Sequence, residues 1–309
     1  MSAGRSRVAV IGLGIMGSAF ARHLLQARHR VSGFDPDVER AAASHRQGVA
    51  VAADCSTAVA DADLVLLSLP NNAALDGTVT ELIRTRGAAR DGLTVVELST
   101  LDVECKSRNR GRLDEHGITL LDCPVSGTGA QAEDADIVVY ASGDEAALRN
   151  VESVLRDFSR DVFFLGTFGN GMRMKLIANL LVAVHNVATA EALGLAKKSG
   201  IDPDVFCEVI GAGVAQSRIL ELRAPLMAGS RYAPATMRLD LWQKDMALIE
   251  SFARDIGAPT PLFDATVPLY ETALRRGLGQ LDTAAVFEVL ADLPHGKLGQ
   301  ERENRRDDE

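Results

Sequence analysis

The first half of the chain alternates short apolar runs with stretches whose apolar residues recur at helical spacing. The run 64–69 (LVLLSL) is almost continuously apolar, as expected of a parallel strand that helices cover on both faces. Runs of this kind predict strands at 7–11, 30–34, 64–69, 94–98, 118–121, 137–141 and 162–165. Helical stretches between them indicate βαβ units and a doubly wound parallel α/β sheet.

The second half has a different texture, and no strand is predicted after residue 172. A long helical pattern at 172–198 ends before Gly200, in the manner of a helix C-cap, and Asp202 followed by Pro203 opens the next helix. Further helices are predicted near 216–222, 237–256, 261–276 and 283–290. We therefore predict three parts: an α/β domain at 1–168, an all-α domain at 169–300 and a charged, disordered tail at 301–309.

Composition narrows the class of protein. The 309 residues are 47% hydrophobic and carry a net charge of −9, which argues against non-specific binding to nucleic acid or to an anionic membrane. The start of the chain does not resemble a secretory signal, and no apolar run reaches the roughly 18 residues of a membrane span. The four cysteines form no CxxC pair, so we expect no metal site and reduced thiols in a cytoplasmic protein.

A glycine-rich segment, GLGIMG, lies between the first predicted strand and the first helix. In the dinucleotide fingerprint the first glycine allows a tight turn, the second leaves space for a pyrophosphate, and the third lets the helix pack on the strand. The N-terminus of the helix adds N–H donors. This position favours a Rossmann-type domain over an ordinary glycine turn. The candidate cofactor-binding residues of the segment are Gly12, Leu13, Gly14, Ile15, Met16 and Gly17.

Asp35 bears on the choice of cofactor because it follows the second predicted strand. An acid at this position binds the ribose hydroxyls of NAD and repels the 2′-phosphate of NADP. No arginine follows directly, so the sequence favours NAD over NADP. The alternative is that Asp35 only shapes a turn before Pro36.

Four patterns occur together: GLGIMG at 12–17, DCPVSG at 122–127, GNGMRMKLIAN at 169–179 and QKDM at 243–246. In this order and spacing they resemble the β-hydroxyacid dehydrogenase family, which includes 3-hydroxyisobutyrate dehydrogenase, tartronate semialdehyde reductase, glyoxylate/succinic semialdehyde reductase and L-threonate dehydrogenase. The resemblance covers nearly the whole chain. It implies hydride transfer between a nicotinamide cofactor and a small β-hydroxyacid or its semialdehyde or keto form.

The resemblance also assigns roles to residues. It implies that Lys175 is the catalytic lysine and that Asn179 holds the substrate or orients the lysine. The residues implied to bind the substrate carboxylate are Ser126, Gly127 and Thr128. Those implied to border the cofactor are Leu69, Pro70, Thr100 and Lys244. Thr128 stands where the family usually has a second glycine, which leaves the substrate open.

The chemistry sets conditions on Lys175. A lysine handles the proton of a hydroxyl group only if its pKa falls from about 10.4 toward the working pH, which burial and a nearby positive charge favour. Asn179 is four residues further along the predicted helix, so both side chains share one face. A solvated lysine with an incidental asparagine is the alternative, and Ser126 has its own alternative as a turn residue.

Other functions on the same scaffold remain open. These are a non-catalytic NAD-binding regulatory protein, an imine reductase and a 6-phosphogluconate dehydrogenase-like enzyme. The resemblance implies a homodimer or homotetramer formed through the helical domain. We expect the active site in the cleft between the domains, at the carboxyl ends of the strands.

Overall fold

A computed structural model describes residues 5–86 and 92–292 of the chain. The predicted tail at 301–309 lies outside the described residues. The fold divides into two compact units, Met1–Ile177 and Ala178–Glu309, and this division falls inside one long helix. The predicted boundary at residue 168 lies shortly before that helix begins.

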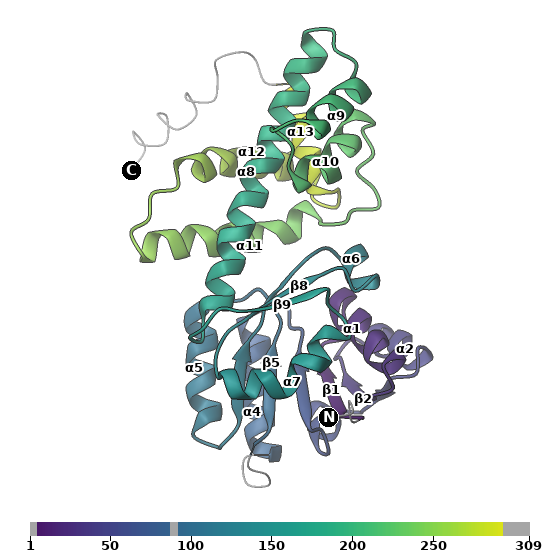
Figure 1. Cartoon of the computed structure of the whole chain (residues 1–309), viewed down its shortest axis with the longest axis vertical. Helices are drawn as coiled ribbons and strands as arrows, with labels where there is room; N and C mark the ends of the chain where they lie inside the picture. Colours follow the sequence, from purple (N-terminus) through teal and green to yellow (C-terminus); the bar gives the residue numbers. More distant parts are fainter. Residues whose placement is uncertain (1–4, 87–91, 293–309) are drawn as a thin grey trace. The chain divides into compact units, whose positions relative to one another are not determined.

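The first unit contains a parallel sheet with helices on both faces (Figure 1). Its strands, in spatial order, are β3 (Ala50–Val51), β2 (Arg30–Phe34), β1 (Arg7–Ile11), β4 (Leu64–Leu67), β5 (Thr94–Glu97) and β6 (Thr119–Asp122). Alternate residues of β1 enter different cores: Val8 and Val10 pack in one cluster, and Ala9 and Ile11 in the other. This double burial explains the continuous apolar runs and confirms the doubly wound fold.

A second, three-stranded sheet departs from the sequence prediction. It consists of β7 (Val125–Ser126), β8 (Val138–Ala141) and β9 (Asp161–Phe164), with β7 antiparallel to β8. The predicted strands 137–141 and 162–165 therefore exist, but they belong to this sheet. Neither β3 nor β7 was predicted, because two residues are too few to show a periodic pattern.

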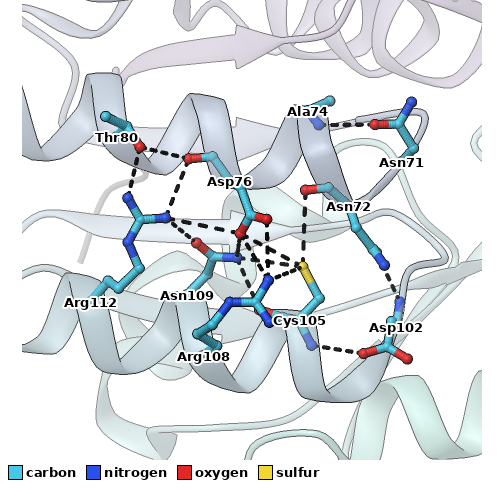
Figure 2. A network of polar contacts seen from close by, with 10 residues as sticks. All are labelled: Asn71, Asn72, Ala74, Asp76, Thr80, Asp102, Cys105, Arg108, Asn109 and Arg112. Atoms are coloured by element: carbon cyan, nitrogen blue, oxygen red, sulfur yellow. Dashed lines mark hydrogen bonds and ion pairs between the residues drawn. The ribbon is translucent and has the colours of Figure 1, made fainter.

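The helices of the first unit connect these strands. They are α1 (Ile15–Gln26), α2 (Val38–Arg46), α3 (Cys55–Val59), α4 (Asn72–Arg86), α5 (Val103–Asp114), α6 (Gly129–Glu133) and α7 (Glu145–Arg156). Helices α4 and α5 are joined by the polar network of Figure 2, in which the Asp76 carboxylate accepts hydrogen bonds from Arg108 and Asn109. These bonds hold the pKa of Asp76 below its usual value.

The second unit is helical over its described part, as predicted. Its elements are α8 (Asn170–Lys198, which begins in the first unit), α9 (Pro203–Ala212), α10 (Arg218–Ala228), α11 (Leu239–Asp255), α12 (Pro261–Arg275), a 3₁₀ turn (Thr283–Ala285) and α13 (Val286–Ala291). Asp202 caps α9 with Pro203 in its first turn, as the sequence predicted. A buried ion pair of 2.7 Å between Arg223 and Asp282 joins α10 to the 3₁₀ turn.

Helix α8 is, within residues 5–86 and 92–292, the one helix long and apolar enough to cross a membrane by length and composition alone. The sequence prediction of no membrane-spanning segment counted only uninterrupted apolar runs, so it did not single out α8. The central helix of a helical domain has the same composition, and α8 carries buried polar side chains with partners on other elements. Asn186, for example, donates hydrogen bonds to the Tyr270 hydroxyl and to the Thr283 carbonyl oxygen. These contacts fit a helix packed in protein.

Candidate active site

The glycine turn between β1 and α1 has two glycines that the protein itself requires. Gly12 has φ +90°, and a Cβ there would overlap the carbonyl oxygen of Ser68. At Gly17 a Cβ would overlap the carbonyl oxygen of Gly12. These close approaches bring the start of α1 onto the ends of β1 and β4, as the fingerprint requires.

Gly14 is different, because nothing in the fold requires a glycine there. Its φ of −68° and ψ of −167° are open to other residues. A Cβ at Gly14 would have the Arg40 guanidinium at 3.9 Å as its nearest neighbour. No described side chain caps α1, and Ile15 is 71% exposed. The turn thus offers backbone N–H groups and free space, which is the cradle that a pyrophosphate needs.

Asp35 lies directly behind this turn and is 7% exposed. Its Oδ2 accepts a hydrogen bond of 2.7 Å from the Leu13 N–H, and its Oδ1 accepts one of 2.9 Å from the Asp37 N–H. The Asp35 carboxylate therefore stabilises both the glycine turn and the turn at residues 35–37. Each oxygen keeps a second lone pair with which it can accept a bond from a ligand hydroxyl.

The loops after β4 and β5 are tied together at the same edge of the sheet. The Leu69 N–H donates a bond of 2.7 Å to the Ser99 hydroxyl, and the Ser99 N–H donates one of 2.9 Å to Glu97 Oε1. Pro70 is exposed and Thr100 is half-buried. The structure thus brings the predicted cofactor-bordering residues of these two loops to one edge.

The PVSG turn lies against the start of α1. Gly127 has φ +150°, and a Cβ there would come within 2.6 Å of Ile137. A Cβ on Gly129, at the start of α6, would come within 2.6 Å of Ile15. Thr128 forms a capping box with Gln131 at the start of α6, which engages both its N–H and its hydroxyl group. Ser126, half-buried, precedes this cap.

The start of α8 is packed tightly against β6. A Cβ on Gly171 would come within 2.6 Å of the Asp122 carbonyl oxygen and would overlap that of Tyr140. The Met172 N–H donates a bond of 2.8 Å to Asp122 Oδ2. Lys175, on the second turn of this helix, is 9% exposed, so it is not the solvated lysine of the alternative interpretation.

Asn179 lies one helical turn beyond Lys175, in the second unit. Its Nδ2 donates a bond of 3.0 Å to Asp245 Oδ2, and the Lys244 ammonium lies 3.4 Å from Asp245 Oδ1. Asp245 was not predicted as a site residue. Its place in QKDM, directly after Lys244, was the available signal, but the bond to Asn179 spans 66 residues of sequence.

The remaining features of the described chain do not add to this site. The described residues contain no group of three or more His, Cys, Asp or Glu side chains that could hold a metal ion. A pocket of about 290 Å³ lies in the helical unit, lined by residues such as Glu250, Arg254 and Asp264. None of the predicted site residues lines it.

Comparison with known proteins covers almost the whole chain. Residues 7–166 match the family model of the NAD-binding domain of 6-phosphogluconate dehydrogenase. Residues 169–290 match the model described as NAD-binding of NADP-dependent 3-hydroxyisobutyrate dehydrogenase.

Individual relatives agree with these models. L-threonate dehydrogenase of Pectobacterium atrosepticum is 30% identical over 92% of this chain and 93% of that protein. Glyoxylate/succinic semialdehyde reductase 2 of Arabidopsis thaliana is 31% identical over 93% of this chain and 80% of that protein. A solved 3-hydroxyisobutyrate dehydrogenase of Mycobacterium tuberculosis, described with L-serine, is 28% identical. It covers 93% of this chain and 99% of its own, with a TM-score of 0.85.

Proposed function

The chain belongs to the β-hydroxyacid dehydrogenase family, and we propose that it transfers a hydride between NAD(H) and a small β-hydroxyacid or its semialdehyde or keto form. The relatives named above act, by their names, on short acids that carry a hydroxyl or an aldehyde group. The observation that carries the proposal is the burial of Lys175 directly after the turn of α8 that is fixed to β6, in the same unit as the glycine turn.

The cofactor would lie on the glycine turn, with its pyrophosphate at Gly14 and the N-terminus of α1. The free space at Gly14 supports this placement, because a side chain there would meet little of the protein and would stand where the pyrophosphate must approach. Asp35 would accept hydrogen bonds from the adenosine ribose, and its carboxylate favours NAD over NADP. Leu69, Pro70 and Thr100 would border the nicotinamide half, with Lys244 near the ring.

Lys175 would handle the proton of the substrate. When bound, the nicotinamide supplies or accepts the hydride at the carbon that carries the hydroxyl group. In the oxidation, the neutral amine of Lys175 accepts the hydroxyl proton, and in the reduction its ammonium returns that proton to the oxygen. Burial disfavours the charged form of a lysine, which fits a residue that must exchange a proton near neutral pH.

The substrate carboxylate would lie at the PVSG turn. Ser126 offers a hydroxyl group and Gly127 a backbone N–H, which are ordinary donors to a carboxylate. Thr128 uses its polar groups to cap α6 and so shapes the turn. Asn179, held by Asp245, would keep its amide oxygen available to Lys175 or to the substrate hydroxyl.

Assembly and location are part of the proposal. The helical unit exposes several large apolar side chains on and around α9, including Ile201, Val205 and Val209, which supports a homodimer or homotetramer. The four cysteines are free, which fits the reducing cytoplasm. The net charge of −9 supports a small-molecule substrate, with neither nucleic acid nor membrane as a partner.

Absorbance of the reduced nicotinamide tests the function. The panel is 3-hydroxyisobutyrate, glycerate, 4-hydroxybutyrate and threonate, with NAD and with NADP, beside the corresponding aldehydes in the reverse direction. We expect turnover with NAD on at least one of these acids. Absence of turnover in both directions, in a protein that binds NADH, would support the non-catalytic alternative. Faster turnover with NADP would contradict the role given to Asp35.

A further inference from the structure

Three charged side chains that the proposed reaction does not use are fully buried together in the first unit. Glu97 ends β5, Asp122 ends β6, and Lys106 lies on α5; each side chain is 0% exposed. The Lys106 ammonium lies 2.5 Å from Glu97 Oε2 and 2.8 Å from Asp122 Oδ1. Two carboxyl groups share one ammonium, so this buried triad has a net negative charge when all three groups are ionised.

One arm of the triad reaches the start of α8. The second oxygen of Asp122, Oδ2, accepts hydrogen bonds from the Met172 N–H at 2.8 Å and from the Ser142 hydroxyl at 3.0 Å. The Ser142 oxygen in turn accepts a bond of 2.9 Å from the Gly171 N–H. The Asp122 carboxyl group therefore lies at the positive end of α8, where a negative charge is favourable. Lys175 is three residues further, about 4.5 Å along the helix axis.

The other arm reaches the loops that would border the cofactor. Glu97 Oε1 accepts a bond from the Ser99 N–H, and the Ser99 hydroxyl accepts one from the Leu69 N–H. The same three side chains thus connect the loops after β4 and β5 with the helix that carries Lys175.

A separate polar network joins α5 to α4. Figure 2 shows Cys105, Arg108 and Asn109 of α5 turned toward Asp76 of α4. Lys106, on the same helix, is fully buried and pairs instead with Glu97 and Asp122. Burial acts to lower the pKa of the Lys106 ammonium, but the two carboxylates outweigh it and raise the pKa. Burial raises the pKa of Glu97.

Stability alone does not explain this arrangement. A buried ion pair is commonly no more stable than apolar residues of the same volume, because removing charges from water is costly. Fixed charges do, however, hold the elements that carry them in one geometry.

We propose that Lys106 is a positioning residue, which ties Glu97 and Asp122 together and so sets the start of α8, with Lys175, relative to the loops that border the cofactor. This inference rests on the proposed function for its consequence in catalysis. The structural part, that the triad holds the first turn of α8, stands without it.

The test uses variants of equal net charge, so that an effect on the position of α8 can be told apart from a loss of stability. Lys106→Met alone leaves two buried carboxylates without a cation and is expected to fold poorly. Adding Glu97→Gln restores the wild-type net charge, so the double variant Glu97→Gln/Lys106→Met should fold. We expect its kcat to fall by about tenfold or more, because small displacements of a catalytic group are costly, while the Kd for NADH stays within about twofold. Arg108→Met, on the exposed face of α5, is the matched control and should keep the wild-type kcat.

Asp122→Asn gives a second, independent readout. It removes a carboxylate from the start of the helix that carries Lys175 and should move the Lys175-dependent limb of the kcat–pH profile to lower pH, because a negative charge at the helix start favours the ammonium. The ionisable groups of the buried cluster are Glu97, Lys106, Asp122 and the thiol of Cys123, and Arg173 is the charged residue at the start of α8 beside Lys175. The double variant Glu97→Gln/Lys106→Met keeps the wild-type net charge, so this limb of its kcat–pH profile should stay at the wild-type pH.

Hydrogen exchange keeps the inference testable if the wild type shows no turnover, which would count against the proposed function alone. The Gly171 and Met172 amides should exchange at least about tenfold faster in the double variant than in the wild type or in Arg108→Met, because local opening becomes easier. Wild-type exchange at these amides overturns the inference. Wild-type kcat in a folded double variant, with an active wild type, overturns its catalytic part.

Discussion

Two helices of the first unit begin with glycine-rich segments, and the two helix starts are built in opposite ways. At α1 no described side chain caps the helix, and the space beside Gly14 is open. At the start of α8 the protein itself occupies this space. Gly171 lies against the carbonyl oxygens of Tyr140 and Asp122, and the Asp122 carboxylate accepts a hydrogen bond from the Met172 N–H.

The difference shows that the N–H groups at a helix start can either bind a ligand or fix the helix in the protein. Free N–H groups at a helix start attract an anion, and an open start suits a ligand that comes and goes. A start that receives its own buried carboxylate has no need of a ligand, and the helix gains a fixed position. We therefore assign cofactor binding to the start of α1 and the placement of Lys175 to the start of α8.

Among the variants that compare the two helix starts, Gly171→Ala is expected to have the largest effect. The added methyl group would overlap backbone atoms of β6 and β8, which cannot move aside as a flexible side chain can. We expect a loss of several kcal/mol in stability, or a displaced α8 with kcat lowered about 100-fold. Thermal unfolding and steady-state kinetics measure the two outcomes.

Gly194→Ala is the matched control for Gly171→Ala, because it lies on the same helix with only Phe287 nearby, at 3.9 Å. It should keep the wild-type kcat and raise stability by up to about 1 kcal/mol, since alanine favours the helix over glycine. Equal behaviour of the two variants would remove the distinction between the two helix starts.

Gly14→Ala should have the opposite profile to Gly171→Ala. Its backbone conformation suits alanine and the space is open, so Tm should stay close to the wild-type value. A methyl group where the pyrophosphate approaches should weaken NADH binding by about 10- to 100-fold. Gly17→Ala, which overlaps the Gly12 carbonyl oxygen, should instead lower Tm. Fluorescence titration with NADH measures the binding, and undiminished affinity in Gly14→Ala would remove the pyrophosphate from this turn.

Arg40→Ala is expected to have the smallest effect. The Arg40 guanidinium is the nearest group to the open side of Gly14, although it is exposed and also pairs with Asp37 at 3.5 Å. We expect NADH affinity to fall by about two- to fivefold, and less at high salt, as for other exposed charges. Arg46→Ala, on the last turn of α2, is the control. A loss that does not depend on salt would point to a packing role for Arg40.

The sequence was sufficient for the parts of the fold that depend on local patterns. The short runs at β1, β2 and β4 placed these strands correctly, and so did the capping residues Asp202 and Pro203 for α9. The sheet of β7, β8 and β9 could not be separated from the main sheet, because strand pairing is a long-range property that periodicity does not report.

The site shows the same limit. The motifs located Gly14 and Lys175, but both GLGIMG and GNGMRMK are glycine-rich helix starts in sequence, so their different construction was not visible. The partners of Lys106 and Asn179 come from distant segments: Asp122 is 16 residues from Lys106, and Asp245 is 66 residues from Asn179. A charged residue at the end of a buried strand, as at Glu97 and Asp122, was the one local sign of the triad.

The most direct test of the account compares Lys175→Ala with Lys198→Ala, a control on the last turn of the same helix. On a substrate that the wild type turns over, Lys175→Ala should lower kcat by about 10²- to 10⁴-fold, the usual contribution of a general acid–base group. Its Kd for NADH, measured by fluorescence titration, should stay within about twofold of the wild-type value, and Lys198→Ala should match the wild type in both. Retention of kcat in a folded Lys175→Ala variant would contradict the account, because no other described residue has been given the proton.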